Sequence, residues 1–316
     1  MLDLTKDVLK VSIGLPVFNG EKTIGRAIES ILSQTFKEFI VIISDNASTD
    51  STQIICEEYE KKDKRIRYIR QKNNLGPLKN FRFLLDITNS KYFVWIAHDD
   101  FWDKKFLEKN IGILDSKKDV VGSIGQTNFI GDFWVVNKNE KFIRKTYKKI
   151  RRHFLSLECY STNGSKYEDR IKNCLKSSRY PACIYSLFRT NILKKSINHT
   201  IHPWDAISIL KILKYGNLHV FDETLLYRGQ GGVSNTNSIE LLINKKVKFH
   251  EILINRIPFQ KWCIQNLGKK VFLQNIGYFI KLGSSGPQIL LLDTIKFLFK
   301  KDRKKIYFEE DLGNKY

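Results

Sequence analysis

Short apolar runs alternate with amphipathic segments along the first hundred residues of the chain. Four of these runs are rich in β-branched and aromatic residues, which is typical of buried strands: Val11–Phe18, Phe39–Ser44, Ile66–Ile69 and Tyr92–Ala97. The segments between them place apolar residues at helical spacing, most clearly in residues 21–33. We therefore predict a β-α-β-α-β-α-β unit with a mostly parallel sheet and right-handed crossovers. Because proline cannot donate to a strand ladder, we expect the first strand to end or become irregular at Pro16.

The pattern is looser after residue 120. Residues 122–136 predict a strand pair, while Ala182–Phe188 and His219–Tyr227 each predict one strand. Between them, Ala206–Lys214 has the spacing of an amphipathic helix.

The composition changes again beyond Ser234. Three segments there read as helices in which apolar residues alternate with Lys and Arg: Ile239–Ile257, Phe259–Ile280 and Pro287–Tyr307. The predicted fold class is therefore an α/β domain over residues 1–235, with a helical C-terminal extension over residues 236–316.

Carboxylates follow two of the predicted strands directly. Asp45 ends the second strand, and His98, Asp99 and Asp100 follow the fourth. Adjacent carboxylates next to a buried strand are costly unless a positive group meets them, and a divalent cation carrying a phosphate-bearing substrate would serve. Because ligands bind at the carboxyl ends of strands in open α/β sheets, we expect both clusters to line one edge. The competing interpretation is a solvated turn in which Asp103 caps the next helix.

Net charge and cysteine usage narrow the class of protein. The formal charge of +21 favours an anionic partner, such as nucleic acid, acidic lipid or a phosphorylated substrate, without choosing among them. The five cysteines are scattered and form no CxxC pair, which indicates reduced thiols in a cytosol. The N-terminus lacks the pattern of a secretory signal, and no uninterrupted apolar stretch is long enough to span a bilayer. We therefore expect a cytoplasmic protein.

Three motifs of the first hundred residues occur together: VSIGLPVFNGEKTIGRAIESILSQTFKEFIVIISDNASTD, NNLGPLKNF and YFVWIAHDD. This combination resembles the family 2 glycosyltransferases of the GT-A fold, and the resemblance covers about residues 10–234. It implies a transfer of a sugar from a nucleoside-diphosphate donor to a hydroxyl acceptor. It also implies a set of donor-nucleotide contacts: Pro16, Phe18, Asn19, Glu21, Asp45, Asn74, Gly76, Asn80, His98 and Arg228.

The same resemblance implies a divalent cation, Mg²⁺ or Mn²⁺. The last carboxylate of the family's DxD motif matches Asp99, but the first falls on Ala97, so Asp99 and Asp100 are both candidate ligands. The stretch that starts at Arg228 is similar to the family's YRxHxxS tail, whose Arg meets the pyrophosphate. Gln230 stands where the family's His can complete the metal shell, and a Gln oxygen is a workable ligand for Mg²⁺.

Asp205 precedes the predicted helix Ala206–Lys214 and has two compatible interpretations. It stands where an N-cap would, and it resembles the family's acidic residue that deprotonates the acceptor hydroxyl. A helix N-terminus stabilises a carboxylate in either role. The mechanism implied by the resemblance is inverting.

Two basic segments suggest which molecules the protein could bind. Residues 138–176 interleave basic and aromatic side chains, which fits either nucleic-acid binding or a solvated basic loop. Pro287–Tyr307 has one apolar face and a basic end, which fits docking on an anionic membrane surface. The alternative for this helix is packing on the preceding domain with a solvated basic rim.

We therefore expect an inverting, metal-assisted glycosyltransferase of surface glycan or polysaccharide assembly. A UDP-sugar is the default donor, a glycan or lipid-linked molecule is the acceptor, and the location is cytoplasmic, peripheral on the inner face of a membrane. A sugar nucleotidyltransferase is a rival, but GLPVFNGEKT lacks a Gly-rich basic phosphate loop. A non-catalytic nucleic-acid-binding protein would explain the charge but not the strand-end carboxylates, so we expect no nucleic-acid partner.

Overall fold

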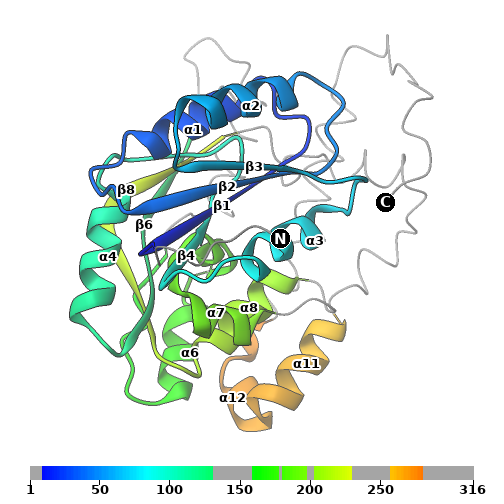
Figure 1. Ribbon diagram of the computed structural model, residues 1–316. Helices are drawn as coiled ribbons and strands as arrows, with labels where there is room; N and C mark the ends of the chain where they lie inside the picture. Colours follow the sequence, from blue (N-terminus) through cyan, green and yellow to red (C-terminus); the bar gives the residue numbers. More distant parts are fainter. Residues whose placement is uncertain (1–8, 131–158, 178–179, 198–202, 230–256, 280–316) are drawn as a thin grey trace, which may run out of the picture.

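A computed structural model of the chain describes residues 9–130, 159–177, 180–197, 203–229 and 257–279. The described residues contain an eight-stranded sheet with helices on both faces (Figure 1). The strands are β1 (Val11–Val17), β2 (Phe39–Asp45), β3 (Ile66–Arg70), β4 (Tyr92–Trp95), β5 (Phe101–Trp102), β6 (Val120–Phe129), β7 (Leu187–Arg189) and β8 (Asn217–Arg228). The helices are α1 (Ile24–Leu32), α2 (Thr52–Lys62), α3 (Pro77–Asp86), α4 (Phe106–Ser116), α6 (Tyr167–Leu175), the 3₁₀ helix η1 (Tyr180–Tyr185), α7 (Thr190–Ser196), α8 (Trp204–Ile212), α11 (Ile257–Leu267) and α12 (Lys269–Gln274).

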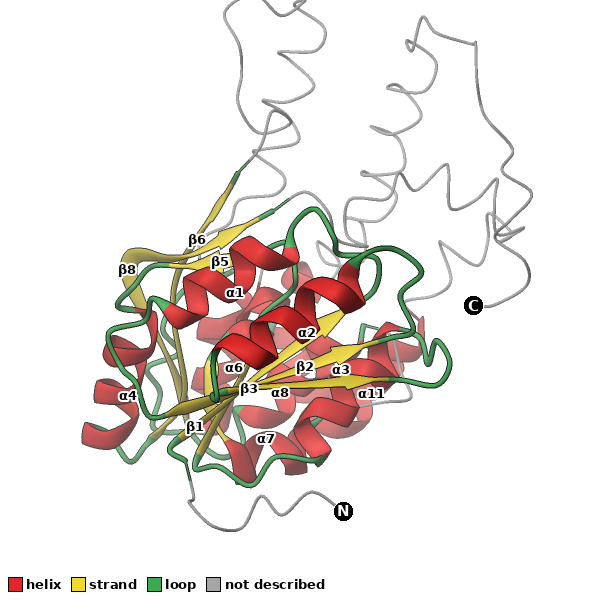
Figure 2. Ribbon diagram, turned by 45° about the horizontal axis from the view of Figure 1, so that its top comes forward, coloured by secondary structure: helices red, strands yellow, loops and turns green. Residues whose placement is uncertain are grey.

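The strand order is β3-β2-β1-β4-β7-β6-β8-β5. The first four strands pair in parallel, as the repeated βα pattern predicts, because each helix carries the chain back before the next strand begins. Strand β1 lies between β2 and β4, and all seven of its residues are buried. Helices α1 and α2 cover one face beside β1–β3, while α3, α7 and α8 lie on the other (Figures 1 and 2). The predicted α/β fold class is confirmed.

Strand β1 does not end at Pro16, contrary to the expectation from the sequence. Pro16 stays in register with Ser44 of β2, and the strand continues to Val17. The carbonyl of Gly14 accepts a hydrogen bond from the Ile96 amide, so positions 14 and 16 both turn toward β4. The pairing with β4 stops at Gly14, and Pro16 therefore sits where no ladder donor is needed.

The second half of the sheet departs further from the local pattern. Residues 182–188 were predicted as one strand, but η1 occupies most of this stretch and β7 covers only Leu187–Arg189. β7 is antiparallel to both β4 and β6, which places it between them. Of the strand pair predicted over residues 122–136, the described part belongs to β6 alone. The predicted strand His219–Tyr227 is confirmed within β8.

Two helices of the predicted C-terminal extension lie among the described residues. The segment predicted as one helix from Phe259 forms α11 and α12 instead, because Gly268 adopts a φ of 87° between them. Buried residues such as Phe259 and Trp262 join the same apolar core as the sheet. The predicted helix Pro287–Tyr307 lies outside the described residues. No helix in the described part of the chain has both the length and the apolar character needed to cross a bilayer.

Candidate functional site

The carboxyl ends of β1, β2 and β4 meet at one edge of the sheet. Val17 is in register with Asp45, and the pairing of β4 with β1 runs to Trp95, just before the acid loop, which we define as residues 97–100. Strand β8 reaches the same edge, because Tyr227 pairs with Phe101 directly after the acid loop. The expectation that the two carboxylate clusters line one edge is therefore confirmed, and Arg228 joins them.

The loop after β1 is tied to the loop after β2. Asn19 adopts a φ of 51°, its amide donates to Ser48 Oγ at 2.9 Å, and its Oδ1 accepts the Thr49 amide at 2.9 Å. Glu21 and Asp50 complete the tie, since the Glu21 amide donates to Asp50 Oδ2 at 3.0 Å. The side chain of Asn19 is thus used to hold the two loops together.

Asp45 is fully buried and accepts three hydrogen bonds. Its Oδ1 accepts the Ser48 amide at 2.8 Å, while its Oδ2 accepts Tyr68 Oη at 2.6 Å and Arg70 Nη1 at 3.0 Å. Burial raises the pKa of Tyr68, and the bond to Asp45 adds to the effect. The sequence interpretation missed Tyr68 and Arg70, although their spacing of two on β3 already places them on one face.

The loop before α3 closes the same side of the edge. Asn74 Oδ1 accepts both Asn46 Nδ2 and the Gly76 amide at 2.8 Å, and Gly76 begins the helix with a φ of 79°. Asn80 is buried and donates to the Ser44 carbonyl at 2.9 Å. The predicted nucleotide loop therefore lies against the end of β2, with the Asn80 amide engaged in holding it there. Asn46 was not predicted.

The acid loop is anchored from α1 and its preceding turn. His98 Nδ1 lies 2.8 Å from Thr23 Oγ1, and burial lowers the pKa of His98. Arg26 Nη2 donates to the Asp99 carbonyl at 2.8 Å, and the Arg26 guanidinium stacks over the Phe101 ring. These contacts fix the backbone of the loop, while no described residue hydrogen-bonds to the Asp99 carboxylate, which is itself buried.

Asp100 faces the end of β8. Its Oδ1 accepts the Gly229 amide at 3.0 Å, and its Oδ2 lies 3.4 Å from Arg228 Nε without accepting a hydrogen bond from any described residue. Burial raises the pKa of Asp100 to about 7; the Arg228 charge opposes this rise and the Asp99 charge adds to it. Two adjacent buried carboxylates, Asp99 and Asp100, thus have the charge of one guanidinium, that of Arg228, acting on both of them.

This arrangement suits a hard divalent cation. The described residues contain no group of three or more His, Cys, Asp or Glu side chains around one point. A cation here would take Asp99, and the open Oδ2 of Asp100, with its other ligands supplied by a diphosphate and water, which is how Mg²⁺ is commonly held. Gln230, the third predicted ligand, lies outside the described residues.

Asp205 lies in the first turn of α8, with Pro203 at the N-cap, so the prediction that Asp205 is itself the N-cap is wrong. Its Oδ1 accepts the adjacent Ala206 amide at 2.8 Å. Trp204 anchors this helix end, with its ring 6.3 Å from Trp95 at the end of β4. Asp205 is therefore held at a helix end that packs against the site edge.

Tyr185 connects this helix end to the acid loop. The Arg228 guanidinium lies 5.0 Å from the centre of the Tyr185 ring. Burial raises the pKa of Tyr185 to about 12, with Arg228 opposing the rise and Asp100, Asp205 and Asp99 adding to it. The electrostatic environment of the phenol thus includes Arg228 and these three carboxylates. Tyr185 was not predicted because the local pattern suggested a strand.

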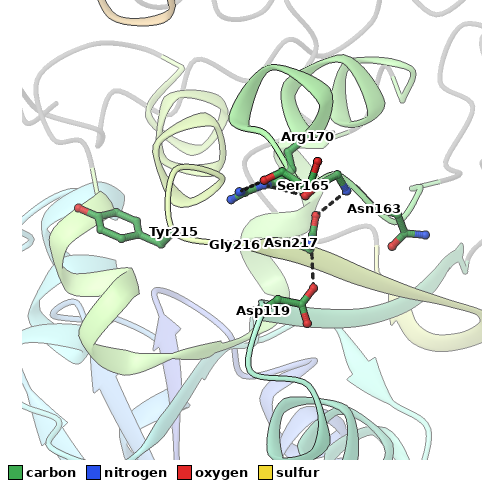
Figure 3. Close-up of a pocket in the computed structure, with 8 residues that line it drawn as sticks. Asp119, Asn163, Ser165, Arg170, Tyr215, Gly216 and Asn217 are labelled. Carbon is green, nitrogen blue, oxygen red and sulfur yellow. Dashed lines mark hydrogen bonds between the residues drawn. The ribbon is translucent and has the colours of Figure 1, made fainter.

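A separate cavity of about 410 Å³ lies beside the start of β8, lined by residues that include Asp119, Arg170 and Asn217 (Figure 3). Arg170 donates to three backbone carbonyls, and Asn217 bridges Asp119 and the Gly164 amide. These groups hold the surrounding loops, and none of the predicted site residues lines this cavity.

Known proteins resemble this chain in sequence and in fold. A glycosyltransferase of Methanocaldococcus jannaschii is 31% identical over 146 residues, which cover 46% of this chain and 50% of that protein. A glycosyltransferase of Haemophilus influenzae is 34% identical over 138 residues, 39% of this chain and 43% of that protein. The chain therefore spans about half the length of these relatives.

Solved structures match more of the chain at lower identity. S. aureus TarS 1–349 in complex with UDP-GlcNAc has a TM-score of 0.53 at 17% identity, over 91% of this chain and 89% of TarS. The mannosyltransferase PcManGT of Pyrobaculum calidifontis, in complex with GDP-Man and Mn²⁺, has a TM-score of 0.53 at 13% identity, over 93% of this chain and 75% of that chain. These similarities confirm the GT-A type of fold. The model of glycosyl transferase family 2 matches residues 12–194, more than half of the chain, and this protein therefore belongs to the family 2 glycosyltransferases.

Proposed function

We propose that this glycosyltransferase moves a sugar from a UDP-sugar donor to a hydroxyl group of a glycan or lipid-linked acceptor in polysaccharide assembly, with inversion and with Mg²⁺ or Mn²⁺. The observation that carries the proposal is the acid loop, where Asp99 and Asp100 are buried next to each other and Asp100 Oδ2 lies 3.4 Å from Arg228 Nε at the strand edge. The UDP-GlcNAc in TarS supports a uridine nucleotide, and the Mn²⁺ in PcManGT supports a metal. Family membership disfavours the nucleotidyltransferase and nucleic-acid-binding alternatives.

The donor would lie along the edge from β2 to the acid loop. We assign the nucleoside to the side of Asp45 and Asn74, where Pro16, Phe18, Asn19, Glu21, Gly76, Asn80 and His98 shape the surrounding loops. Arg228 would receive the diphosphate, because a guanidinium presents paired donors to phosphate oxygens. Asp99, whose carboxylate has no donor among the described residues, is the better direct metal ligand, while Asp100 Oδ1 is engaged by Gly229. A bound cation would neutralise the charge that develops on the departing diphosphate.

The acceptor would enter on the side of α8. Asp205 would take the proton of the acceptor hydroxyl as its oxygen attacks the anomeric carbon, and the bond from that carbon to the diphosphate oxygen would break. Attack opposite the leaving group inverts the anomeric carbon. The first turn of α8 stabilises the carboxylate form of Asp205 before the reaction.

A thermal-shift comparison tests the donor assignment. We expect UDP with Mn²⁺ to raise the melting temperature of the wild type, because a ligand at a hundredfold excess over its Kd stabilises by about 2.7 kcal/mol. GDP should stabilise less, and Asp99→Asn should lose the Mn²⁺-dependent part of the shift. A wild type that UDP and Mn²⁺ do not stabilise, or an Asp99→Asn variant that keeps the full shift, would contradict the proposal.

We also propose peripheral attachment to an anionic membrane surface on the cytoplasmic side, where a lipid-linked acceptor would be presented. The support is the basic amphipathic segment Pro287–Tyr307 and, in α12 and just after it, Leu273 and Ile276, exposed by 62% and 42% next to exposed Lys269.

Flotation with anionic vesicles at low salt tests this attachment. We expect Leu273→Glu to weaken flotation, whereas Ile54→Glu, at an equally exposed residue of α2, should not. The attachment would be refuted if both variants floated as well as the wild type. It would also be refuted if the wild type did not float with the vesicles.

A further inference from the structure

The Tyr185 ring lies beside Arg228 at the site edge, yet its hydroxyl forms no hydrogen bond with any described residue. Its ring lies against the Arg228 guanidinium, whose Nε lies 3.4 Å from Asp100 Oδ2. An aromatic face attracts a cation and restricts the orientation of a planar guanidinium. The ring therefore fixes Arg228 in a position beside the acid loop.

The position of Tyr185 is set by the sheet and not by a mobile loop. Tyr185 ends η1, and β7 begins two residues later between β4 and β6. The Ser186 amide donates to the Cys183 carbonyl at 3.0 Å, which closes the last turn of η1. The Tyr185 side chain is partly buried, and its hydroxyl accepts or donates no hydrogen bond among the described residues, so the hydroxyl is available to a ligand that enters at this edge.

The groups around the Tyr185 hydroxyl indicate which chemical class of ligand it would bind. Because burial raises the pKa of Tyr185 to about 12, its hydroxyl stays protonated at neutral pH and can donate a hydrogen bond. A donor next to Arg228 complements a phosphate oxygen better than a sugar hydroxyl, because hydrogen bonds to charged groups are the stronger ones.

We propose that Tyr185 binds the diphosphate of the donor, with its hydroxyl donating to an oxygen of the β-phosphate and its ring holding Arg228 in place. This inference rests on the proposed function, since it requires a nucleoside-diphosphate donor at this edge. Tyr185 would be a third group that contacts the diphosphate, in addition to Arg228 and the metal. It belongs to η1, which comes before α8 in the chain.

Calorimetric titration of UDP and of UMP, each with Mn²⁺, tests the assignment. Tyr185→Phe should bind UDP about tenfold or more weakly, the loss expected for a hydrogen bond to a charged group. Its affinity for UMP should change less than about twofold, because the removed contact is with the β-phosphate. Tyr185→Leu should lose more UDP affinity than Tyr185→Phe, since it also frees the guanidinium of Arg228.

Tyr167→Phe is the matched control. The Tyr167 hydroxyl donates to the Leu210 carbonyl of α8 at 2.9 Å, so this variant also removes one tyrosine hydroxyl that contacts or adjoins α8, but away from the acid loop. It should keep the wild-type affinity for both nucleotides. A Tyr185→Phe variant that binds UDP like the wild type, or that loses UDP and UMP affinity equally, would overturn the inference alone. A wild type that does not bind UDP would overturn the proposed donor and this inference together.

Discussion

Gly229 should be the least tolerant glycine of the site edge, and its substitution tests how the end of β8 closes on the acid loop. A Cβ added at this position would lie 2.1 Å from the Asp99 carbonyl oxygen and 3.0 Å from Asp99 Cβ. Contact with a backbone oxygen cannot be relieved by a side-chain rotation, so the Arg228–Gly229 backbone must shift by more than an ångström, roughly the difference from an ordinary contact. That shift would break the bond from the Gly229 amide to Asp100 Oδ1 at 3.0 Å.

The expected cost of Gly229→Ala is about 1–3 kcal/mol from overpacking. This corresponds to a fall in melting temperature of roughly 2–4 °C per kcal/mol for a domain of this size. Because Arg228 moves with Gly229, the affinity for UDP with Mn²⁺ should also fall. Differential scanning calorimetry and calorimetric titration on the full chain measure the two effects.

Gly112→Ala is the control for this experiment. Gly112 lies inside α4, and a Cβ there would meet no atom within 4 Å. Alanine should therefore stabilise this helix by about 0.5–1 kcal/mol and leave UDP binding unchanged. If Gly229→Ala melts at the wild-type temperature and binds UDP normally, the close approach of β8 to the acid loop is refuted.

The remaining predictions concern the three carboxylates of the site. Asp99→Asn should abolish Mn²⁺-dependent hydrolysis of a UDP-sugar while the melting temperature without ligand stays close to that of the wild type; full hydrolysis would exclude Asp99 as a ligand. Asp205→Asn should lower turnover by about 10²–10⁴-fold with little change in UDP affinity, and a mainly lower affinity would indicate a binding role instead. The pKa of Asp100 is raised to about 7, so the native state binds more protons than the unfolded state between about pH 4 and 7. Without metal, the stability contributed by this group should thus fall as pH rises through that range, by up to about 1.4 kcal/mol per pH unit, and Asp100→Asn should flatten the dependence; an unchanged pH profile would contradict the assigned burial.

The sequence by itself determined the half of the sheet formed by β3, β2, β1 and β4, and the reactive edge at the ends of these strands. The strands β1, β2 and β4 are buried on both faces, so their apolar runs are visible without knowledge of any partner. Right-handed parallel crossovers then bring the ends of these strands to one edge, which is why Asp45 and the acid loop could be placed together in advance. The family motifs also cover this part of the chain, with the match at residues 12–194.

Tertiary structure decided the features that depend on distant partners. β5 and β7 have two and three residues, too few to show a pattern, and they exist because β8, β4 and β6 supply their hydrogen bonds. Tyr185 reaches the site through that pairing.

The surroundings of the charged groups at the site edge were likewise decided by the tertiary structure. Asp45 pairs with Arg70, Gly229 approaches Asp99, and the Gly229 amide bonds to Asp100, whose burial raises its pKa. The two residues of each pair are at least 25 positions apart in the sequence. Sequence spacing reports only neighbours along one element, so it identified which carboxylates lie at the edge. The fold alone fixed their partners, and with them which oxygen is left open for a ligand.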